Sequence, residues 1–366
     1  MVAHANPRAR EARSRFTIMS SRLESEADFE ATAFGFLYRQ FTKPKPIPTG
    51  INLEGQVALV TGSNVGIGLA ACRQLLELGL SHLVMGVRSP VRGEAAANLL
   101  RRQFPDAMVT VWPLDLESYD SVRDFAARCA TLPRLDIAIL NAALMKLAYS
   151  VVAATGHETS LQVNYLSTAL LAILLLPILK KSKSNSKSSR PPVLSIVGSD
   201  LAYSTPMGTS KGGGGPILQQ LDTPDGYNQF VQYGRSKVLL TFFFAKLAAE
   251  FVGPDDVLVN MPNPGTTKGT AFFREFSSVA VRLWAVFQFL VARDVDVGAT
   301  TYVDAAVARG SECHGSLLSD WAIKPFPKLW YTKEGQAFSE RLWEETMEEL
   351  QFAGVSGILQ GLRDSH

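Results

Sequence analysis

The chain has 366 residues, of which 46% are hydrophobic and 19% charged, and its formal net charge is +2. This length can bury a full core, and the small charge, without a basic stripe interleaved with aromatic residues, argues against a nucleic-acid partner. The three cysteines, Cys72, Cys129 and Cys313, are too widely spaced for a disulfide framework or a CxxC metal site, so we expect no metal and a reducing, cytoplasmic setting.

Residues 1–50 are expected to form an N-terminal extension to one large domain. Residues 1–22 carry five arginines against one acid, Glu11, which is the composition of a transit peptide. No apolar or clearly amphipathic pattern follows, so a disordered start with Met19 as the initiator is favoured, and the targeting peptide is the alternative.

One helix is predicted from about Ser21 to Phe41, because Ser21 and Glu24 have the spacing of a capping box. The helix is expected to end at the Pro-rich linker that follows, which contains Pro44, Pro46 and Pro48. Its apolar side chains follow a helical spacing: Leu23, Phe29, Phe34, Leu37 and Phe41. We expect this stripe to pack on the main domain, with membrane contact as the alternative.

The β-branched run Val57–Thr61 is followed directly by a glycine-rich stretch, Gly62-Ser63-Asn64-Val65-Gly66-Ile67-Gly68. The pattern predicts a strand, a glycine turn and a helix start, which together can seat a dinucleotide pyrophosphate. Gly62 allows the tight turn, Gly66 lets the backbone approach the phosphates, and Gly68 lets the helix press against the sheet. Alone the signal is weak, because this spacing is not G-x-G-x-x-G.

Strands and helices then alternate along the chain. Further strands are predicted at Leu83–Val87, Met108–Trp112, Ile137–Leu140, Val193–Val197 and Val257–Met261. Helices are predicted at about Ile67–Leu78, Arg92–Gln103, Ser118–Cys129, Glu158–Leu179 and Gly234–Phe251. This alternation predicts an α/β fold with a doubly wound parallel sheet, whose ligands bind at the carboxyl edge. The apolar run Ala169–Leu179 is shorter than the ~20 residues of a membrane span, so it is expected to be a buried helix.

A phenol and an ammonium, Tyr233 and Lys237, stand four residues apart, on one face of the last predicted helix. A free phenol has a pKa of about 10, too high for ready proton exchange at neutral pH. A cation ~4 Å away at an effective dielectric of ~20 is worth about 4 kcal/mol, or roughly three pK units. We therefore expect Lys237 to bring the pKa of Tyr233 near working pH, as a hydroxyl–carbonyl redox enzyme needs.

Several polar residues stand at or near the carboxyl ends of predicted strands. Asn141 and Asn164 lie in apolar surroundings, where each needs a buried partner or a site to serve. The Ser199 hydroxyl could bond a substrate carbonyl, or Ser199 is a turn serine. Arg88 follows the second strand where an NAD enzyme has a carboxylate, so it predicts NADPH through a bidentate 2′-phosphate contact, unless it is an ordinary surface residue.

Seven sequence elements, in this order and spacing, resemble the short-chain dehydrogenase/reductase family: Thr61-Gly-x-x-x-Gly66-x-Gly68, Asp115-Leu116, Asn141-Ala142, Asn164, Ser199, Tyr233-x-x-x-Lys237 and Pro264-Gly265. The similarity covers about residues 51–270, and the flanks look like retinol-dehydrogenase-like and fungal biosynthetic-cluster members. It implies a Rossmann-type sheet of about seven parallel strands with helices on both faces. The domains expected are a catalytic domain at 51–330, with a lid at about 266–293, and a helical tail at 331–366.

The resemblance also implies roles for individual residues. Tyr233 would exchange the proton of the reacting oxygen, Lys237 would hold the nicotinamide ribose, Ser199 would orient the carbonyl and Asn164 would position a water. It implies NADP(H) contacts at Gly62, Asn64, Gly66, Ile67, Gly68, Arg88, Asp115, Leu116, Asn141, Ala142, Tyr233, Lys237 and Thr266. Two positions depart from the family pattern, because Ala143 and Gly269 stand where glycine and threonine are usual.

The leading hypothesis is an NADPH-dependent oxidoreductase interconverting a ketone or aldehyde and an alcohol on a small-to-medium apolar substrate, in secondary metabolism. The helical apolar stripe in Ala271–Val291 fits an apolar substrate, although packing alone explains it. Alternatives are an enzyme of the same fold whose net reaction is an isomerisation, dehydration or cyclisation, or a non-catalytic nucleotide-binding scaffold. A small-molecule substrate, no integral membrane span and a homo-oligomer are expected.

Overall fold

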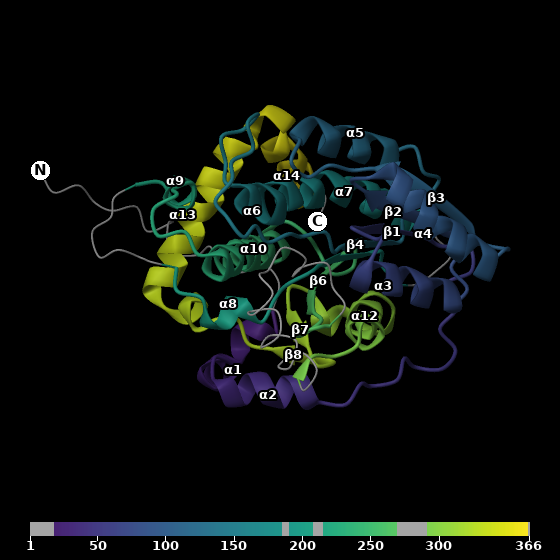
Figure 1. Ribbon diagram of the computed structural model, residues 1–366, viewed down its shortest axis with the longest axis horizontal. Helices are drawn as coiled ribbons and strands as arrows, with labels where there is room; N and C mark the ends of the chain where they lie inside the picture. The colour runs from purple at the N-terminus through teal and green to yellow at the C-terminus, as the bar shows by residue number, and fades with distance from the viewer. Residues whose placement is uncertain (1–17, 185–189, 208–214, 269–290, 365–366) are drawn as a thin grey trace, which may run out of the picture.

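Eight strands form one sheet in the order β3-β2-β1-β4-β5-β6-β7-β8 in the computed structural model, which describes residues 18–184, 190–207, 215–268 and 291–364 (Figure 1). The strands are β1 Val57–Thr61, β2 His82–Val87, β3 Met108–Pro113, β4 Ile137–Leu140, β5 Val193–Ile196, β6 Leu258–Asn263, β7 Leu317–Ser319 and β8 Ala322–Lys324. All pairs are parallel except β7 with β8. The predicted α/β, doubly wound sheet is confirmed, with an antiparallel edge strand in addition.

Helices cover both faces of the sheet (Figure 1). One face carries α3 Gly66–Glu77, α4 Pro90–Gln103 and α12 Val295–Val303. The other carries α5 Tyr119–Cys129, α7 Ser167–Ser184 and α10 Gln229–Glu250. β1 is buried throughout and feeds both cores, because Leu59 joins one apolar cluster while Ala58 and Val60 join the other.

The C-terminal helices α13 Lys333–Glu349 and α14 Val355–Asp364 pack on the α7 and α10 side. Their Phe338, Leu342 and Leu359 belong to the same apolar cluster as those two helices. This tail therefore contributes to the main core.

The predicted buried helix around Ala169–Leu179 is confirmed. It lies in a helical run, Thr159–Lys183, that begins with α6 Thr159–Leu161 and a π-helical turn, Gln162–Leu166. Among the described residues this run alone is long and apolar enough to cross a membrane, and 83% of its most apolar window is buried inside the protein.

The N-terminal segment is not the single helix that the sequence predicted. It forms two 3₁₀ turns, Ser20–Arg22 and Glu24–Glu26, and two short helices, α1 Ala27–Glu30 and α2 Ala33–Phe41. The Ser21 hydroxyl bonds the Ile18 carbonyl instead of forming a capping box. The helix is interrupted between α1 and α2, because the Thr32 side chain caps the N-terminus of α2. The turn is tight: a Cβ on Gly35 would stand 2.1 Å from the Phe29 carbonyl oxygen.

The orientation of this segment also differs from the expectation. Phe29, Phe34, Leu37 and Phe41 are exposed, Phe34 by 70%, and Leu23 is half-buried. The buried side chains of the segment include the polar ones of Glu30, Arg39 and Gln40 instead. The prediction that the apolar stripe packs on the main domain was therefore wrong, and polar contacts hold the segment in place.

Candidate active site

The glycine turn between β1 and α3 has the backbone conformation that the sequence predicted. Gly62 and Gly66 have φ angles of +64° and +62°, in the left-handed region that favours glycine. A Cβ on Gly68 would stand 2.6 Å from the Gly62 carbonyl oxygen, so only glycine allows α3 to approach the turn. Val65 gives α3 no side-chain cap, which leaves its first amides to an anion such as a pyrophosphate. The turn therefore fits a dinucleotide.

Asn141 and Ala142 lie beside this turn, because β4 is the neighbour of β1. Asn141 Nδ2 donates to the carbonyl oxygens of Thr61, at 2.8 Å, and Gly62, at 3.3 Å. The Ala142 amide donates to the Thr61 hydroxyl at 3.0 Å. These bonds fix the shape of the turn at the point where the sheet order reverses, where doubly wound sheets bind ligands. Asn64 and Ile67 lie half-buried in the turn and the first turn of α3.

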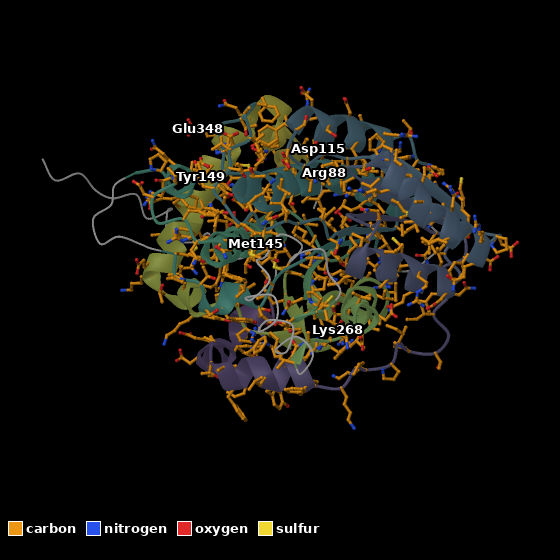
Figure 2. The ribbon with its side chains drawn as sticks, in the orientation of Figure 1. Arg88, Asp115, Met145, Tyr149, Lys268 and Glu348 are labelled. Carbon is orange, nitrogen blue, oxygen red and sulfur yellow. The ribbon has the colours of Figure 1, made fainter. Side chains whose placement is uncertain are left out.

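Arg88, Asp115 and Leu116 follow β2 and β3, which are neighbours in the sheet, at the same edge, and Figure 2 labels Arg88 and Asp115. Asp115 Oδ1 accepts the Glu117 amide at 3.0 Å. The Arg88 side chain is 64% exposed and its Nη1 lies 2.9 Å from Glu117 Oε1. Glu117 was not predicted from the sequence, although its place two residues after Asp115 is a signal for an acidic partner of Arg88.

Tyr233 and Lys237 lie on α10, both buried. Lys237 Nζ donates to the Val197 carbonyl at 2.8 Å and lies 5.8 Å from the centre of the Tyr233 ring. Val197 directly follows β5, so this bond ties α10 to the carboxyl edge of the sheet. The Tyr233 ring and the Lys237 ammonium therefore lie close together, as predicted.

In the cofactor-free protein the pKa of Tyr233 is not lowered, contrary to the prediction. Burial raises the pKa of Tyr233 to about 12, although a hydrogen bond with Ser199 lowers it. Burial also lowers the pKa of Lys237 to about 7. Both shifts have one cause, since a buried site disfavours whichever form of each group is charged. The phenol is therefore a firmly protonated donor at neutral pH.

Ser199 follows β5 and shares its hydrogen bond with Tyr233, as a group that orients a substrate oxygen would. Asn164 is fully buried in the π-helical turn. Its Nδ2 donates to the Leu144 carbonyl at 2.8 Å and the Ser236 hydroxyl at 3.1 Å, and its Oδ1 accepts the Leu144 amide at 2.8 Å. Both amide protons are used, so Asn164 fixes the loop after β4 against α10.

Thr266 follows β6, and residues 269–290 of the predicted lid, with Gly269, lie outside the described residues. The Thr266 backbone is held by Gln40, and the carboxylate of Asp200, next to Ser199, is held by Arg39. Sequence reasoning missed Arg39, Gln40 and Asp200. A small cavity lies between the loop after β5, the end of β6 and β7, and it is lined by Ser199, Ala202, Tyr203, Asn263, Leu317, Leu318, Ser319 and Pro327.

A family model described as short chain dehydrogenase matches residues 56–188. The short chain dehydrogenase virL of Hypocrea virens is 59% identical over 347 residues, covering 95% of this chain and 100% of that protein. The short chain dehydrogenase/reductase mfmJ of Annulohypoxylon moriforme is 44% identical over 330 residues, covering 90% of this chain and 94% of that protein. The similarity therefore extends well beyond the region that the family model matches.

Solved structures resemble the fold. The Pseudomonas aeruginosa RhlG/NADP active-site complex has a TM-score of 0.55 at 22% identity, covering 77% of this chain and 98% of that one. An NADPH-bound short chain oxidoreductase from the same species has a TM-score of 0.53 at 24% identity, covering 73% of this chain and 95% of that one. At these identities the likeness concerns the arrangement of strands and helices.

Proposed function

Because this chain belongs to the short-chain dehydrogenase/reductase family, we propose that it is an NADPH-dependent oxidoreductase that interconverts a ketone or aldehyde and an alcohol. The substrate is a small-to-medium apolar molecule of fungal secondary metabolism. The observation that carries the proposal is the meeting of Tyr233, Ser199 and Lys237 at the edge that also bears the glycine turn. The three free cysteines are buried, which supports a reducing cytoplasm.

The cofactor would lie across the carboxyl edge, with its pyrophosphate on the glycine turn and the N-terminus of α3. When bound, the nicotinamide supplies or accepts the hydride. No carboxylate directly follows β2, and Arg88 stands there instead. Glu117 occupies Nη1 of Arg88, and the guanidinium has further N–H groups that can bind a 2′-phosphate. This supports NADPH over NADH.

The residues of the chain would supply the proton chemistry. In reduction, Tyr233 donates its phenolic proton to the substrate oxygen, and Ser199 bonds that same oxygen and orients it. The raised pKa keeps Tyr233 protonated at neutral pH, so the proton is present to be donated, although a pKa closer to the working pH would let it transfer more readily. Lys237 and Asn164 hold α10, the Val197 backbone and the loop after β4 in register with each other.

The test is NADPH oxidation with panels of ketones and aldehydes, comparing the wild type with Tyr233→Phe. This variant removes only the hydroxyl, and general acid catalysis is worth 10²–10⁴-fold, so turnover should fall at least about 100-fold. Wild-type turnover in Tyr233→Phe would rule out the proposed role. A product of unchanged mass without net NADPH consumption would support the non-redox alternative.

A further inference from the structure

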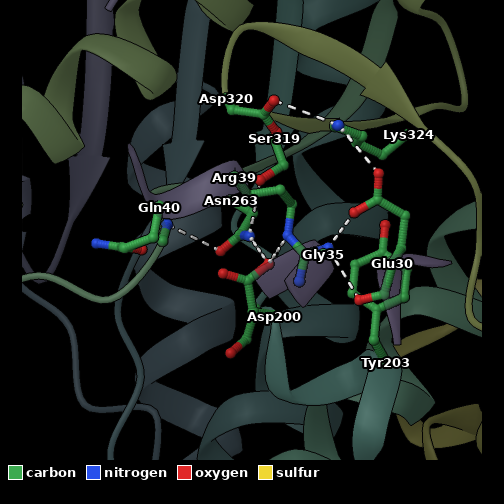
Figure 3. A network of polar contacts seen from close by, with 12 residues as sticks. Glu30, Gly35, Arg39, Gln40, Asp200, Tyr203, Asn263, Ser319, Asp320 and Lys324 are labelled. Carbon is green, nitrogen blue, oxygen red and sulfur yellow. Dashed lines mark hydrogen bonds and ion pairs between the residues drawn. The ribbon is translucent and has the colours of Figure 1, made fainter. Parts of the chain in front are cut away.

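The N-terminal arm, residues 18–41, places its buried polar side chains against the edge of the sheet that bears the candidate site. Glu30, Arg39 and Gln40 are 3%, 2% and 4% exposed. Charged residues are almost never buried this far unless they are paired, because desolvation is expensive. Their partners lie in the loops that follow β5 and β6 and on β8. Figure 3 shows two of them, Asp200 beside Arg39 and Lys324 beside Glu30.

Arg39 connects the arm to the residue next to Ser199. Its Nε donates to Asp200 Oδ1 at 3.0 Å, and its Nη1 donates to the Glu30 carbonyl at 2.9 Å and to the Glu30 carboxylate. Its guanidinium lies 4.9 Å from the centre of the Tyr203 ring. From the sheet side, Asn263 Nδ2 donates to the same Asp200 oxygen at 2.7 Å. The Asp200 carboxylate is thus held between the arm and the end of β6 (Figure 3).

The charge of Asp200 matters for the site itself. Burial is the largest cause of the raised pKa of Tyr233, and repulsion from Asp200 adds to it. Arg39 is the cation that bonds directly to Asp200. The arm therefore sets both the position and the electrostatic balance of the loop that carries Ser199.

Gln40 holds the loop after β6 at Thr266, one of the residues expected to contact NADP(H). Its Nε2 donates to the Thr266 carbonyl at 2.7 Å, and its Oε1 accepts the Thr266 amide at 3.0 Å. Arg293 completes the clamp, since its Nη1 donates to the Pro264 carbonyl at 3.2 Å and its Nε to the Gln40 carbonyl at 3.3 Å. Gln40 thus bonds both backbone groups of Thr266, whose carbonyl also accepts the Arg293 amide at 2.9 Å.

We propose that Arg39 and Gln40 are positioning residues of the active site, with Arg39 acting through Asp200 on the Ser199 loop and Gln40 acting through Thr266 on the cofactor. The inference rests on the proposed function. It makes residues 18–41 a working part of the enzyme, although they precede the first strand of the nucleotide-binding fold.

The experiment separates the two residues by what each changes. Gln40→Ala removes the partner of the Thr266 amide and leaves the Thr266 carbonyl only its bond from the Arg293 amide, so the loop after β6 loses its tie to the arm. The dissociation constant of NADPH, titrated by fluorescence without substrate, should therefore rise about 10-fold or more. Arg39→Met should instead lower kcat about 10-fold or more with little change in NADPH affinity, since misplaced reacting groups can cost up to 10²-fold. In Arg39→Met with Asp200→Asn, which removes the uncompensated carboxylate, kcat should recover in part.

Phe34→Ser is the matched control, because it changes an exposed side chain of the same arm. Its kcat and NADPH affinity should equal those of the wild type. Arg39→Lys, which keeps the positive charge, is the second variant if Arg39→Met does not fold, and its kcat should lie between those of Arg39→Met and the wild type. Folded Gln40→Ala and Arg39→Lys proteins with wild-type NADPH affinity and kcat would overturn the inference, whereas an inactive wild type would overturn the proposed function.

Discussion

Lys237 is a cation held almost completely out of water. Its side chain is 3% exposed and its Nζ donates to one backbone carbonyl, that of Val197. Burial lowers its pKa from 10.5 to about 7. The folded protein therefore disfavours the charged form of Lys237, whereas the unfolded chain does not. Because the two states bind protons differently, Lys237 makes the free energy of unfolding depend on pH.

Between about pH 7 and pH 10.5 the unfolded chain binds a proton at Lys237 that the folded chain lacks. The contribution of Lys237 to the free energy of unfolding should therefore rise with pH in this window, by up to about 1.4 kcal/mol per pH unit. In Lys237→Met that contribution is lost. Urea denaturation of the cofactor-free proteins from pH 6.5 to 9.5 measures the difference in slope.

Tyr233→Phe is the control for this measurement, because the pKa of Tyr233 in the folded protein, about 12, and its ordinary pKa of 10.0 both lie above the measured range. Its stability should keep the wild-type slope. Equal slopes in the wild type and Lys237→Met would show that the lysine is not desolvated as the structure has it.

The Tyr233 and Lys237 pair shows what a sequence can reveal at the scale of a residue. A spacing of four predicts that the two groups share a helix face, and they do. The expected fall in the pKa of Tyr233 assumed the effective dielectric of ~20 that is typical near a protein surface, and it left out the cost of burying the charged phenolate. The burial of the pair depends on the packing of α10 against the end of β5 and against α8 Leu201–Ser204, which the local pattern does not describe.

At the scale of an element, the N-terminal arm is the main departure from the sequence-based expectation. Its apolar side chains do share one face, as their spacing predicts, but that face points to solvent and not to the main domain. Polar partners decide that direction: Asp200, Thr266 and Lys324 lie more than 150 residues further along the chain. The glycine turn, by contrast, was predictable, because its φ angles and close contacts arise within a few residues and one neighbouring strand.

The orientation of the arm can be tested with two adjacent positions. Phe34 is 70% exposed, so Phe34→Ser should change the free energy of unfolding by no more than about 0.5 kcal/mol. At Gly35 a Cβ would stand 2.1 Å from the Phe29 carbonyl oxygen, so Gly35→Ala should destabilise by about 1–3 kcal/mol. Urea denaturation at pH 7 compares the two variants. A larger loss in Phe34→Ser would mean that the apolar stripe is the packed face after all.

At the scale of the whole molecule, one polar cluster joins segments that are far apart in the sequence. His157 Nδ1 lies 2.7 Å from Asp222 Oδ2, and its Nε2 lies 3.3 Å from Glu349 Oε1. The Tyr119 hydroxyl donates to the same Glu349 oxygen at 3.0 Å. The cluster therefore ties the end of α13 to the start of α5, to the loop before α6 and to the residue after α9 Ile217–Leu221.

Burial by itself would lower the pKa of His157, but hydrogen bonds and attraction from Asp222 and Glu349 outweigh it and raise the pKa to about 9. The same contact lowers the pKa of Glu349, against its burial. Because the folded pKa of His157 exceeds the ordinary 6.5, its stabilisation is complete below about pH 6.5 and is lost as the pH rises through about 9.

His157→Gln should therefore lower the free energy of unfolding by about 1–3 kcal/mol at pH 6, and the deficit should shrink toward zero by pH 10. Between about pH 7 and 9 this loss opposes the gain from Lys237, so the wild type should show a shallow pH dependence. Each single variant keeps the contribution of the other group alone. In His157→Gln, where Lys237 remains, the free energy of unfolding should rise with pH; in Lys237→Met, where His157 remains, it should fall. Parallel pH curves for the wild type and both variants would contradict this balance, since a shallow curve made of two opposed terms must steepen when either term is removed.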